Sequence, residues 1–368
     1  MPSRDQHIDR PLFFSVVFLL FLGLSNIVSA TIVDSYSGEF VRQLASLACG
    51  CCVFALFSFV DLKIFFRNAN WLFVATLILL ASVLFVGTTV NGAQRWIDLG
   101  PLGSFQPSEL AKLMLILWFS RYLAGSKDGR YGSLKTSLRR FFLLYFTLAV
   151  PTILIMLQPD LGTAIVFIGV GTAMMWVSGF SWKWFSAVFL AGGLALPHFL
   201  HEYQRKRIMI FMNPDSDPTG AGWNIIQAKI AIGSGGFWGK GWMLGSQNRM
   251  NFVPEHHTDF IFTVVGEEMG FIGAFCIIVL LSCVVLRSWQ LAKSSLSAYD
   301  SFLAFGLGTL FFMHTFINIG MTSGILPVVG IPLPFVSYGG TSLIVNMAAL
   351  GILNNISQRT AVLERFTS

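Results

Sequence analysis

The chain has 368 residues, of which 54% are hydrophobic and only 11% are charged, and its formal net charge is +6. A soluble chain carries roughly 25% charged residues, whereas here apolar runs of about 18 residues recur from end to end. This composition excludes a soluble enzyme, a disordered chain and a disulfide scaffold. It predicts an all-α polytopic membrane protein with a single domain over residues 1–368.

Apolar stretches long enough to span a membrane predict about ten transmembrane helices. Their expected ranges are 12–33, 42–60, 71–89, 107–124, 141–158, 162–180, 184–200, 260–286, 302–321 and 339–356. The first run ends near Val28-Ser29-Ala30, which looks like a signal-peptide cleavage site, but the run is too long and too apolar for an h-region. We therefore expect it to be retained as the first span.

Lysines and arginines in the short loops predict the direction of the spans, because these residues are enriched on the cytoplasmic side. One side carries only Arg42 and Arg95. The other side carries Arg4, Arg10, Lys63, Arg67, Arg121, Lys127, Arg130, Lys135, Arg139, Arg140, Lys183, Arg287, Lys293, Arg359 and Arg365. Both termini are therefore expected in the cytoplasm, and the large loop 201–258, between helices 7 and 8, outside. This placement accounts for the positive charge without nucleic-acid binding.

Two motifs place carboxylates at the outer ends of spans, where a charge needs a partner or water. In QPSELAK at 106–112, the spacing puts Glu109 and Lys112 on one helix face. They form either a pair that only neutralises itself or one wall of a polar cavity. In QPDLGT at 158–163, Asp160 can cap the sixth helix, or it can join Glu109 in one site at the same depth.

The outer loop 201–258 contains a short amphipathic stretch, 224–232, that predicts a helix lying in the membrane interface. The glycine-rich exit around Gly239-Lys240-Gly241 is either a flexible connection or a place where backbone N–H groups and a lysine approach a phosphate. Asp259 follows, where the loop meets the eighth span. Its neighbour Phe260 would partly desolvate this carboxylate and so favour it as a general base.

These motifs resemble those of the SEDS family (shape, elongation, division and sporulation). The resemblance covers nearly the whole chain, with the motifs in family order. It rests on NGAQRWI at 91–97, QPSELAK at 106–112, QPDLGT at 158–163, GSGGFWGKGW at 233–242, FVPEHHTDFIF at 252–262 and GILPVVGIPLPFVSYGG at 324–340. Within the family, the KGW-x-x-GSQ pattern at 240–247 is more similar to the elongation branch, RodA, than to the division branch, FtsW.

The resemblance implies a ten-helix peptidoglycan glycosyltransferase that polymerises lipid II at the outer face of the bacterial cytoplasmic membrane during elongation and rod-shape maintenance. It implies Asp259 as the catalytic residue. The substrate and cavity residues expected with it are Glu109, Lys112, Asp160, Arg95, Lys240, Gln227 and Ser337. The expected partners are a class B penicillin-binding protein, elongation-complex proteins, membrane lipids, lipid II and undecaprenyl diphosphate-linked glycan.

The residues and the resemblance predict one mechanism. The chain has no Walker motif, so we expect no nucleotide, and the lipid diphosphate bond of the substrate supplies the energy. Asp259 would accept the proton of the attacking GlcNAc 4-hydroxyl while undecaprenyl diphosphate leaves with inversion. Positive charge opposite the diphosphate would come from Arg95, Lys112 and Lys240.

Two points stay open in this mechanism. A divalent cation, Mg or Mn, is expected at Glu109 or Asp160, and Asp259 could be a metal ligand instead of the base. The alternative function is a lipid II flippase. A flippase needs polar groups along the whole path, whereas few ionisable groups lie in the inner halves of these spans.

Overall fold

The computed structural model describes residues 8–31, 38–90, 93–100, 103–127, 138–199, 202–213, 217, 220–246 and 257–367. Its long helices are α1 (Arg10–Thr31), α2 (Gly38–Phe59), α3 (Leu62–Val86), α4 (Pro107–Lys127), α5 (Leu138–Leu157), α6 (Leu161–Val177), α7 (Trp182–Phe199), α12 (Gly270–Ser294), α13 (Ala298–Thr322) and α14 (Gly340–Thr367). Within this described part, α1, α2, α3, α5, α12 and α13 are long and apolar enough to cross a membrane. The predicted all-α polytopic fold is confirmed.

Local sequence sets the ends of several of these helices. The Asp61 side chain accepts from the Lys63 N–H (3.1 Å) and caps α3. Pro107 opens α4, where its missing N–H costs no intrahelical bond. Glu109 lies in the same first turn, where the helix dipole favours a negative charge.

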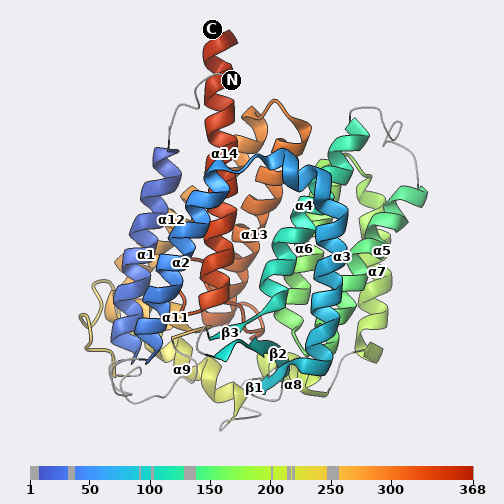
Figure 1. Ribbon diagram of the computed structural model, residues 1–368. Coiled ribbons are helices and arrows are strands. Elements are labelled where there is room, and N and C mark those ends of the chain that lie inside the picture. Colours follow the sequence, from blue (N-terminus) through green and yellow to red (C-terminus); the bar gives the residue numbers. More distant parts are fainter. Residues whose placement is uncertain are drawn as a thin grey trace.

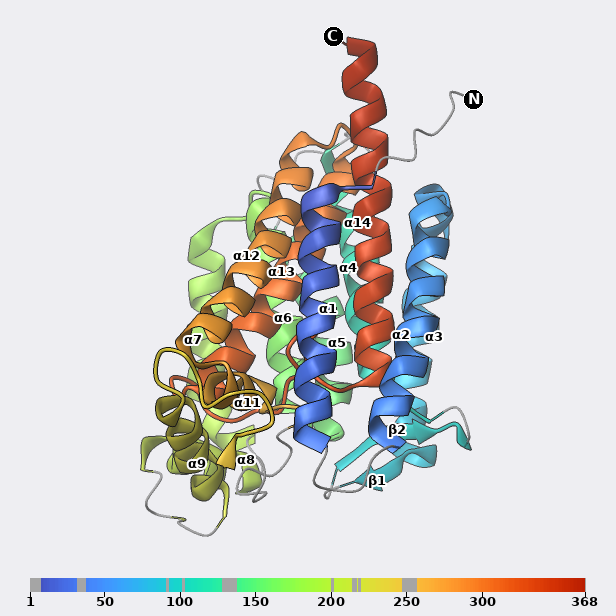
Figure 2. The same cartoon turned by 90° about the vertical axis from the view of Figure 1, so that its left-hand side faces the viewer.

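The long helices form one bundle (Figure 1). The start of α1 and the end of α14 lie at one end, called here the terminal end, and the last turns of α14 project beyond the other helices (Figure 2). α14 packs against α2, α12 against α13, and α4 against both α3 and α13. The opposite end, called the loop end, carries the shorter elements (Figures 1 and 2).

The loop end contains a small sheet that the sequence analysis did not predict. Strands β1 (Thr88–Val90), β2 (Ala93–Asp98) and β3 (Ser104–Phe105) pair antiparallel in the order β1-β2-β3. β-branched residues in β1 and an Asn-Gly pair in the sequence between β1 and β2 are typical of a hairpin. Thr88 and Thr89 of β1 were assigned to a transmembrane span because they directly follow the apolar run that begins at residue 71.

Among the residues that the structure describes, the loop end also carries the shorter helices α8 (Glu202–Met212), α9 (Ala221–Ser234) and α11 (Ile261–Glu268). α9 confirms that the stretch 224–232 is helical. The predicted single span 260–286 is wrong, because the chain breaks into α11 and α12 at Gly270, whose φ is +63°. A Cβ at Gly270 would collide with the backbone nitrogen of Gly239, so the glycine-rich exit packs into this break.

The glycine-rich exit uses its backbone to cap α11. Lys240 and Gly241 donate their N–H groups to the carbonyls of Glu267 and Glu268, both at 3.0 Å. The last carbonyls of a helix have no partner within it, so these bonds satisfy them from outside. The N–H groups of Lys240 and Gly241, which one of the two alternatives placed near a phosphate, are therefore engaged within the protein.

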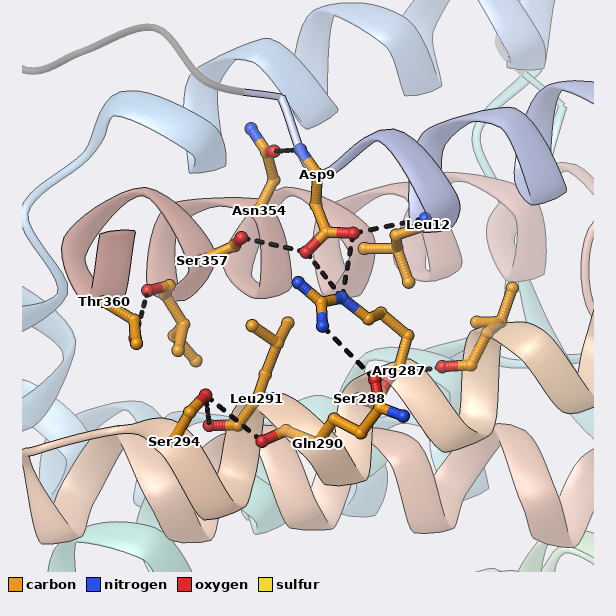
Figure 3. A network of polar contacts seen from close by, with 12 residues as sticks. Asp9, Leu12, Arg287, Ser288, Gln290, Leu291, Ser294, Asn354, Ser357 and Thr360 are labelled. Atoms are coloured by element: carbon orange, nitrogen blue, oxygen red, sulfur yellow. Dashed lines mark hydrogen bonds and ion pairs between the residues drawn. The ribbon is translucent and has the colours of Figure 1, made fainter. Parts of the chain in front are cut away.

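A buried polar network ties helices together at the terminal end (Figure 3). Arg287 Nε of α12 donates to both Asp9 carboxylate oxygens, at 2.9 and 3.1 Å. Ser357 Oγ of α14 donates to the same carboxylate (2.9 Å), and the Asp9 N–H donates to Asn354 Oδ1 (3.2 Å). The Asp9 side chain is 1% exposed, so its charge is matched inside the protein and fixes the start of α1 against α12 and α14.

An apolar groove of about 400 Å³ lies between α12 and α13. Its lining includes Leu281, Val285, Trp289, Phe312 and Phe316. It contains none of the residues predicted to act on a substrate. Those residues lie elsewhere, at the loop end of the bundle.

Candidate functional site

A buried ion pair stands at the start of α4. Lys112 Nζ is 2.7 Å from Glu109 Oε1, and both side chains are only 3% exposed. The predicted pairing of these residues on one helix face is confirmed. Inside the bundle such a pair is neutral as a unit, and removal of either partner would leave an uncompensated charge.

Asp160 lies at the N-terminal end of α6 and is almost fully buried. Its Oδ1 accepts from the Thr163 N–H (3.1 Å), which confirms the predicted cap, and its Oδ2 accepts from Gln106 Nε2 (3.3 Å). The guanidinium of Arg95, on β2, is 3.9 Å from Oδ1. The carboxylate is therefore both a helix cap and the centre of a polar cluster that joins β2, the residue before α4 and the start of α6.

Arg95 also holds the turn that carries Asp160. Its Nε donates to the Gln158 carbonyl (3.1 Å), and its Nη2 donates to the Pro159 carbonyl. The Gln158 side chain in turn donates to the Leu80 carbonyl of α3 (2.8 Å). The sheet, which the sequence analysis did not predict, therefore places Arg95 of β2 against the turn between α5 and α6.

Asp259 lies directly before α11 and is partly exposed. Its main-chain carbonyl accepts from Asn318 Nδ2 of α13 (2.8 Å). Its Oδ2 lies beside Gly330, where an added Cβ would be only 3.0 Å away. Gly330 has φ +70°, a conformation that favours glycine, so the backbone can run close to the carboxylate.

Residues 329–331 bring the two carboxylate sites together. A Cβ at Gly162, in the first turn of α6, would be 2.6 Å from the Val329 carbonyl oxygen and 3.3 Å from that of Gly330. The same segment therefore touches the N-terminal end of α6 on one side and Asp259 on the other. The resemblance implies one site for Asp160 and Asp259; the segment 329–331 lies next to the end of α6 that carries Asp160 and next to Asp259, and the common site stays a prediction.

The rest of the connection between α13 and α14 is tied to its surroundings. The Tyr338 N–H donates to the His257 carbonyl (3.0 Å), and the Gly339 N–H donates to Gln43 Oε1 of α2 (3.2 Å). Burial raises the pKa of the Tyr338 phenol above its usual value, and Glu39 adds to the shift. Ser337 Oγ accepts from the Leu333 N–H (2.8 Å), so this predicted substrate residue closes a turn within the connection.

Lys240 and Gln227 lie around α11. Lys240 Nζ is 2.7 Å from Glu267 Oε1 and 3.0 Å from Ser246 Oγ. The Glu267 side chain is 1% exposed, so Lys240 compensates a buried charge at the end of α11 opposite to Asp259. Gln227 is buried on α9, which packs against α11. Their proposed roles toward a substrate stay predictions.

The sequence analysis did not select four buried polar residues near the site. His314 and Asn318 lie on α13, and Glu267 and Glu268 end α11. Glu268 accepts from Ser29 Oγ of α1 at 2.6 and 2.8 Å, which links α1 to α11. The signal was available, because polar residues within apolar runs need a partner or a function.

The expected metal ligands do not form a metal site. Within the described ranges, no three His, Cys, Asp or Glu side chains are placed to hold a metal ion. Glu109 faces the ammonium of Lys112, and Asp160 faces the guanidinium of Arg95. A divalent cation prefers several oxygen ligands whose charge is not already matched by a side-chain cation. The surroundings of Glu109 and Asp160 do not fit Mg or Mn.

The chain is similar to known proteins over nearly its whole length. The cell cycle protein model FtsW/RodA/SpoVE matches residues 10–362. The peptidoglycan glycosyltransferase MrdB of Escherichia coli (strain K12) is 37% identical over 372 residues, which cover 99% of this chain and 98% of MrdB.

Two solved structures are similar in fold and sequence. One is a chain of a peptidoglycan synthase complex that coordinates polymerization and crosslinking, with a TM-score of 0.79, 30% identity, and coverage of 96% of this chain and 98% of that chain. The other is the rod shape determining protein RodA of Thermus thermophilus, with a TM-score of 0.72, 30% identity, and coverage of 96% and 97%. The chain therefore belongs to the FtsW/RodA/SpoVE family of cell cycle proteins, the SEDS family that its motifs resemble.

Proposed function

We propose that this protein is a peptidoglycan glycosyltransferase that polymerises lipid II into glycan strands during cell elongation. The observation that carries the proposal is the segment 329–331, which lies between the partly exposed Asp259 and the end of α6 that carries Asp160. A general base must be accessible to a substrate hydroxyl and held in a fixed place. Asp259 meets both conditions, and the name of MrdB supports the reaction type.

In this proposal the protein lies in the inner membrane. Its loop end faces the periplasm, and its terminal end faces the cytoplasm. Lysines and arginines gather at the terminal end, among them Lys63 and Arg67 at the start of α3, Arg287 and Lys293 late in α12, and Arg359 late in α14. Such enrichment is typical of cytoplasmic loops. Lipid II would then meet Asp259 from the outer leaflet.

The reaction is a single displacement at the anomeric carbon of the lipid-linked chain. The 4-hydroxyl of the acceptor GlcNAc attacks, the bond to the diphosphate breaks, and undecaprenyl diphosphate leaves with the electron pair. Asp259 takes the hydroxyl proton. One carboxylate is sufficient because the diphosphate needs no proton to leave.

The three candidate cations differ in their access to the diphosphate. The side chains of Lys240 and Arg95 are 30% and 22% exposed, whereas that of Lys112 is 3% exposed. We assign direct charge compensation at the diphosphate to Arg95 first. Lys240 is accessible, but its ammonium already matches the charge of Glu267 at the end of α11 away from Asp259. Lys112 would not contact the diphosphate directly, because its ammonium is buried against Glu109. The expectation of Mg or Mn stays a prediction that the surroundings of Glu109 and Asp160 do not favour.

The partner in this proposal is a class B penicillin-binding protein, which crosslinks the strands that this protein forms. The likeness to a chain of a peptidoglycan synthase complex, in which polymerization and crosslinking are coordinated, supports such a partner. The likeness to RodA and the KGW-x-x-GSQ pattern support the elongation branch and contacts with elongation-complex proteins.

The experiment is glycan-chain formation from purified lipid II in detergent, with a moenomycin control for contaminating polymerases. Wild type and Asp259→Ala are compared with and without the penicillin-binding protein. Polymer from the wild-type complex and none from a folded, partner-binding variant supports the proposal. No polymer from any sample, together with lipid II movement in sealed vesicles, would favour the flippase.

A further inference from the structure

Two buried polar residues of α13 face the site and have no role in the reaction as proposed. His314 is 2% exposed and Asn318 is fully buried. They are one helical turn apart, so their side chains lie one above the other on the same face of α13. Burial of a polar side chain costs free energy unless its hydrogen bonds compensate for the lost contacts with water.

His314 joins the ion pair of α4 to the connection between α13 and α14. Its Nε2 is 2.9 Å from Lys112 Nζ, and its Nδ1 is 3.4 Å from the Pro332 carbonyl oxygen. An ammonium can only donate, so Nε2 is the acceptor and the ring proton is on Nδ1. That proton points to the Pro332 carbonyl, and the ring therefore bridges α4 and residue 332.

Asn318 joins the same connection to the backbone of Asp259. Its Nδ2 donates to the carbonyls of Asp259 (2.8 Å) and Ile331 (2.6 Å). Only the amide nitrogen can serve two carbonyls, so the orientation of the amide is fixed. In the described part of the chain, the buried Oδ1 has no hydrogen-bond partner. The Asn318 amide thus holds two backbone segments, at Asp259 and at Ile331, while its own oxygen has no partner among the described residues. Such an unsatisfied buried acceptor is expected at a functional position.

The two sets of contacts meet at adjacent peptide carbonyls, those of residues 331 and 332. We propose that His314 and Asn318 are positioning residues that hold Asp259 in register with the ion pair of α4. This inference rests on the proposed function of Asp259 as the base. Both residues lie on α13. Asn318 fixes the backbone of Asp259, and His314 fixes the ammonium of Lys112.

Substitutions of His314 and Asn318 distinguish a role in positioning Asp259 from a role in packing alone. Asn318→Ala removes both donors to the backbone, and we expect kcat for lipid II polymerisation to fall about tenfold or more while KM changes little. His314→Leu should lower kcat in the same way. His314→Gln should restore most of it, because its amide oxygen can accept from Lys112 as Nε2 does. A purely structural role would not give this split between kcat and KM or this rescue.

Thr309→Val is the matched control on the same helix. Thr309 is buried, and among the residues that the structure describes its hydroxyl donates to the Phe305 carbonyl of its own helix (2.8 Å) and to no other group, so its loss should leave kcat unchanged. The double variant of His314→Leu and Asn318→Ala should lose less than the product of the single losses, because both act through adjacent carbonyls.

Hydrogen exchange gives a readout that needs no activity. In Asn318→Ala, backbone amides of 257–262 should exchange about tenfold faster than in wild type, while those of α5 stay unchanged. Unchanged exchange and unchanged kcat in Asn318→Ala and His314→Leu, in an active wild type, overturn this inference alone. An inactive wild type overturns the proposed function and this inference together.

Discussion

Gly330→Ala tests the placement of Asp259 without a change to any titratable group. The alanine Cβ would be 3.0 Å from Asp259 Oδ2. Normal contacts between non-bonded heavy atoms begin near about 3.5 Å, so the carboxylate has to move by about 0.5 Å. Since a misplacement of about 1 Å can cost about 100-fold in rate, we expect kcat to fall about tenfold.

The backbone strain of this substitution needs its own control. Gly330 has φ +70°, and an alanine in this region costs about 1–2 kcal/mol. Gly100 has φ +64°, and a Cβ there would meet nothing within 4 Å. Gly100→Ala therefore carries the same strain without a contact at the site.

The assay is the initial rate of lipid II polymerisation at saturating substrate, with melting temperatures measured on the same detergent samples. We expect similar melting temperatures for Gly330→Ala and Gly100→Ala, with the loss of kcat confined to Gly330→Ala. Equal rates in the two variants would refute the reasoning, because the contact with Asp259 would then have no bearing on the reaction.

Three further outcomes follow from single contacts. Lys240→Met should lower the free energy of unfolding by about 1–3 kcal/mol, because it removes the ammonium that matches the charge of the buried Glu267, and Lys240→Met with Glu267→Gln should melt higher than the single variant. Asp61→Ala should cost about 1 kcal/mol as a lost helix cap but keep the polymerisation rate. The hydrogen bond from the Lys63 N–H lowers the pKa of Asp61, so this stabilisation is present at neutral pH and is lost only as the pH falls through the lowered pKa. The difference in melting temperature between wild type and Asp61→Ala should therefore be the same at pH 7 and pH 5. Mn²⁺ binding followed by electron paramagnetic resonance should be equal in wild type and Glu109→Gln, and weaker binding in the variant would restore the metal expectation.

Sequence reasoning succeeded where a pattern is local. The spans follow from runs of apolar residues, the cap at Asp160 from its place before a helix, and the pair of Glu109 and Lys112 from their spacing. The break at Gly270 was missed because the glycine stands within one continuous apolar run, and the segment that packs against it, the glycine-rich exit, is distant along the chain.

The arrangement of the site could not be predicted from the residues alone. Asp160 and Asp259 are about a hundred residues apart, and they are linked by a third segment, 329–331, that carries no charge. Asn318 acts through its bonds to backbone carbonyls, which leave no pattern in the sequence. The places of Asp160, Asp259 and Asn318 relative to one another depend on tertiary contacts between segments that are distant in the sequence.

The most direct test of the account is the turnover of bound lipid II by Asp259→Asn. This substitution keeps the size of the side chain and removes its capacity to accept a proton at the reacting hydroxyl. The account predicts wild-type affinity for lipid II, an intact complex with the penicillin-binding protein, and polymerisation reduced by at least about 100-fold. Polymerisation at the wild-type rate by a variant that binds lipid II normally would contradict the assignment of Asp259 as the base.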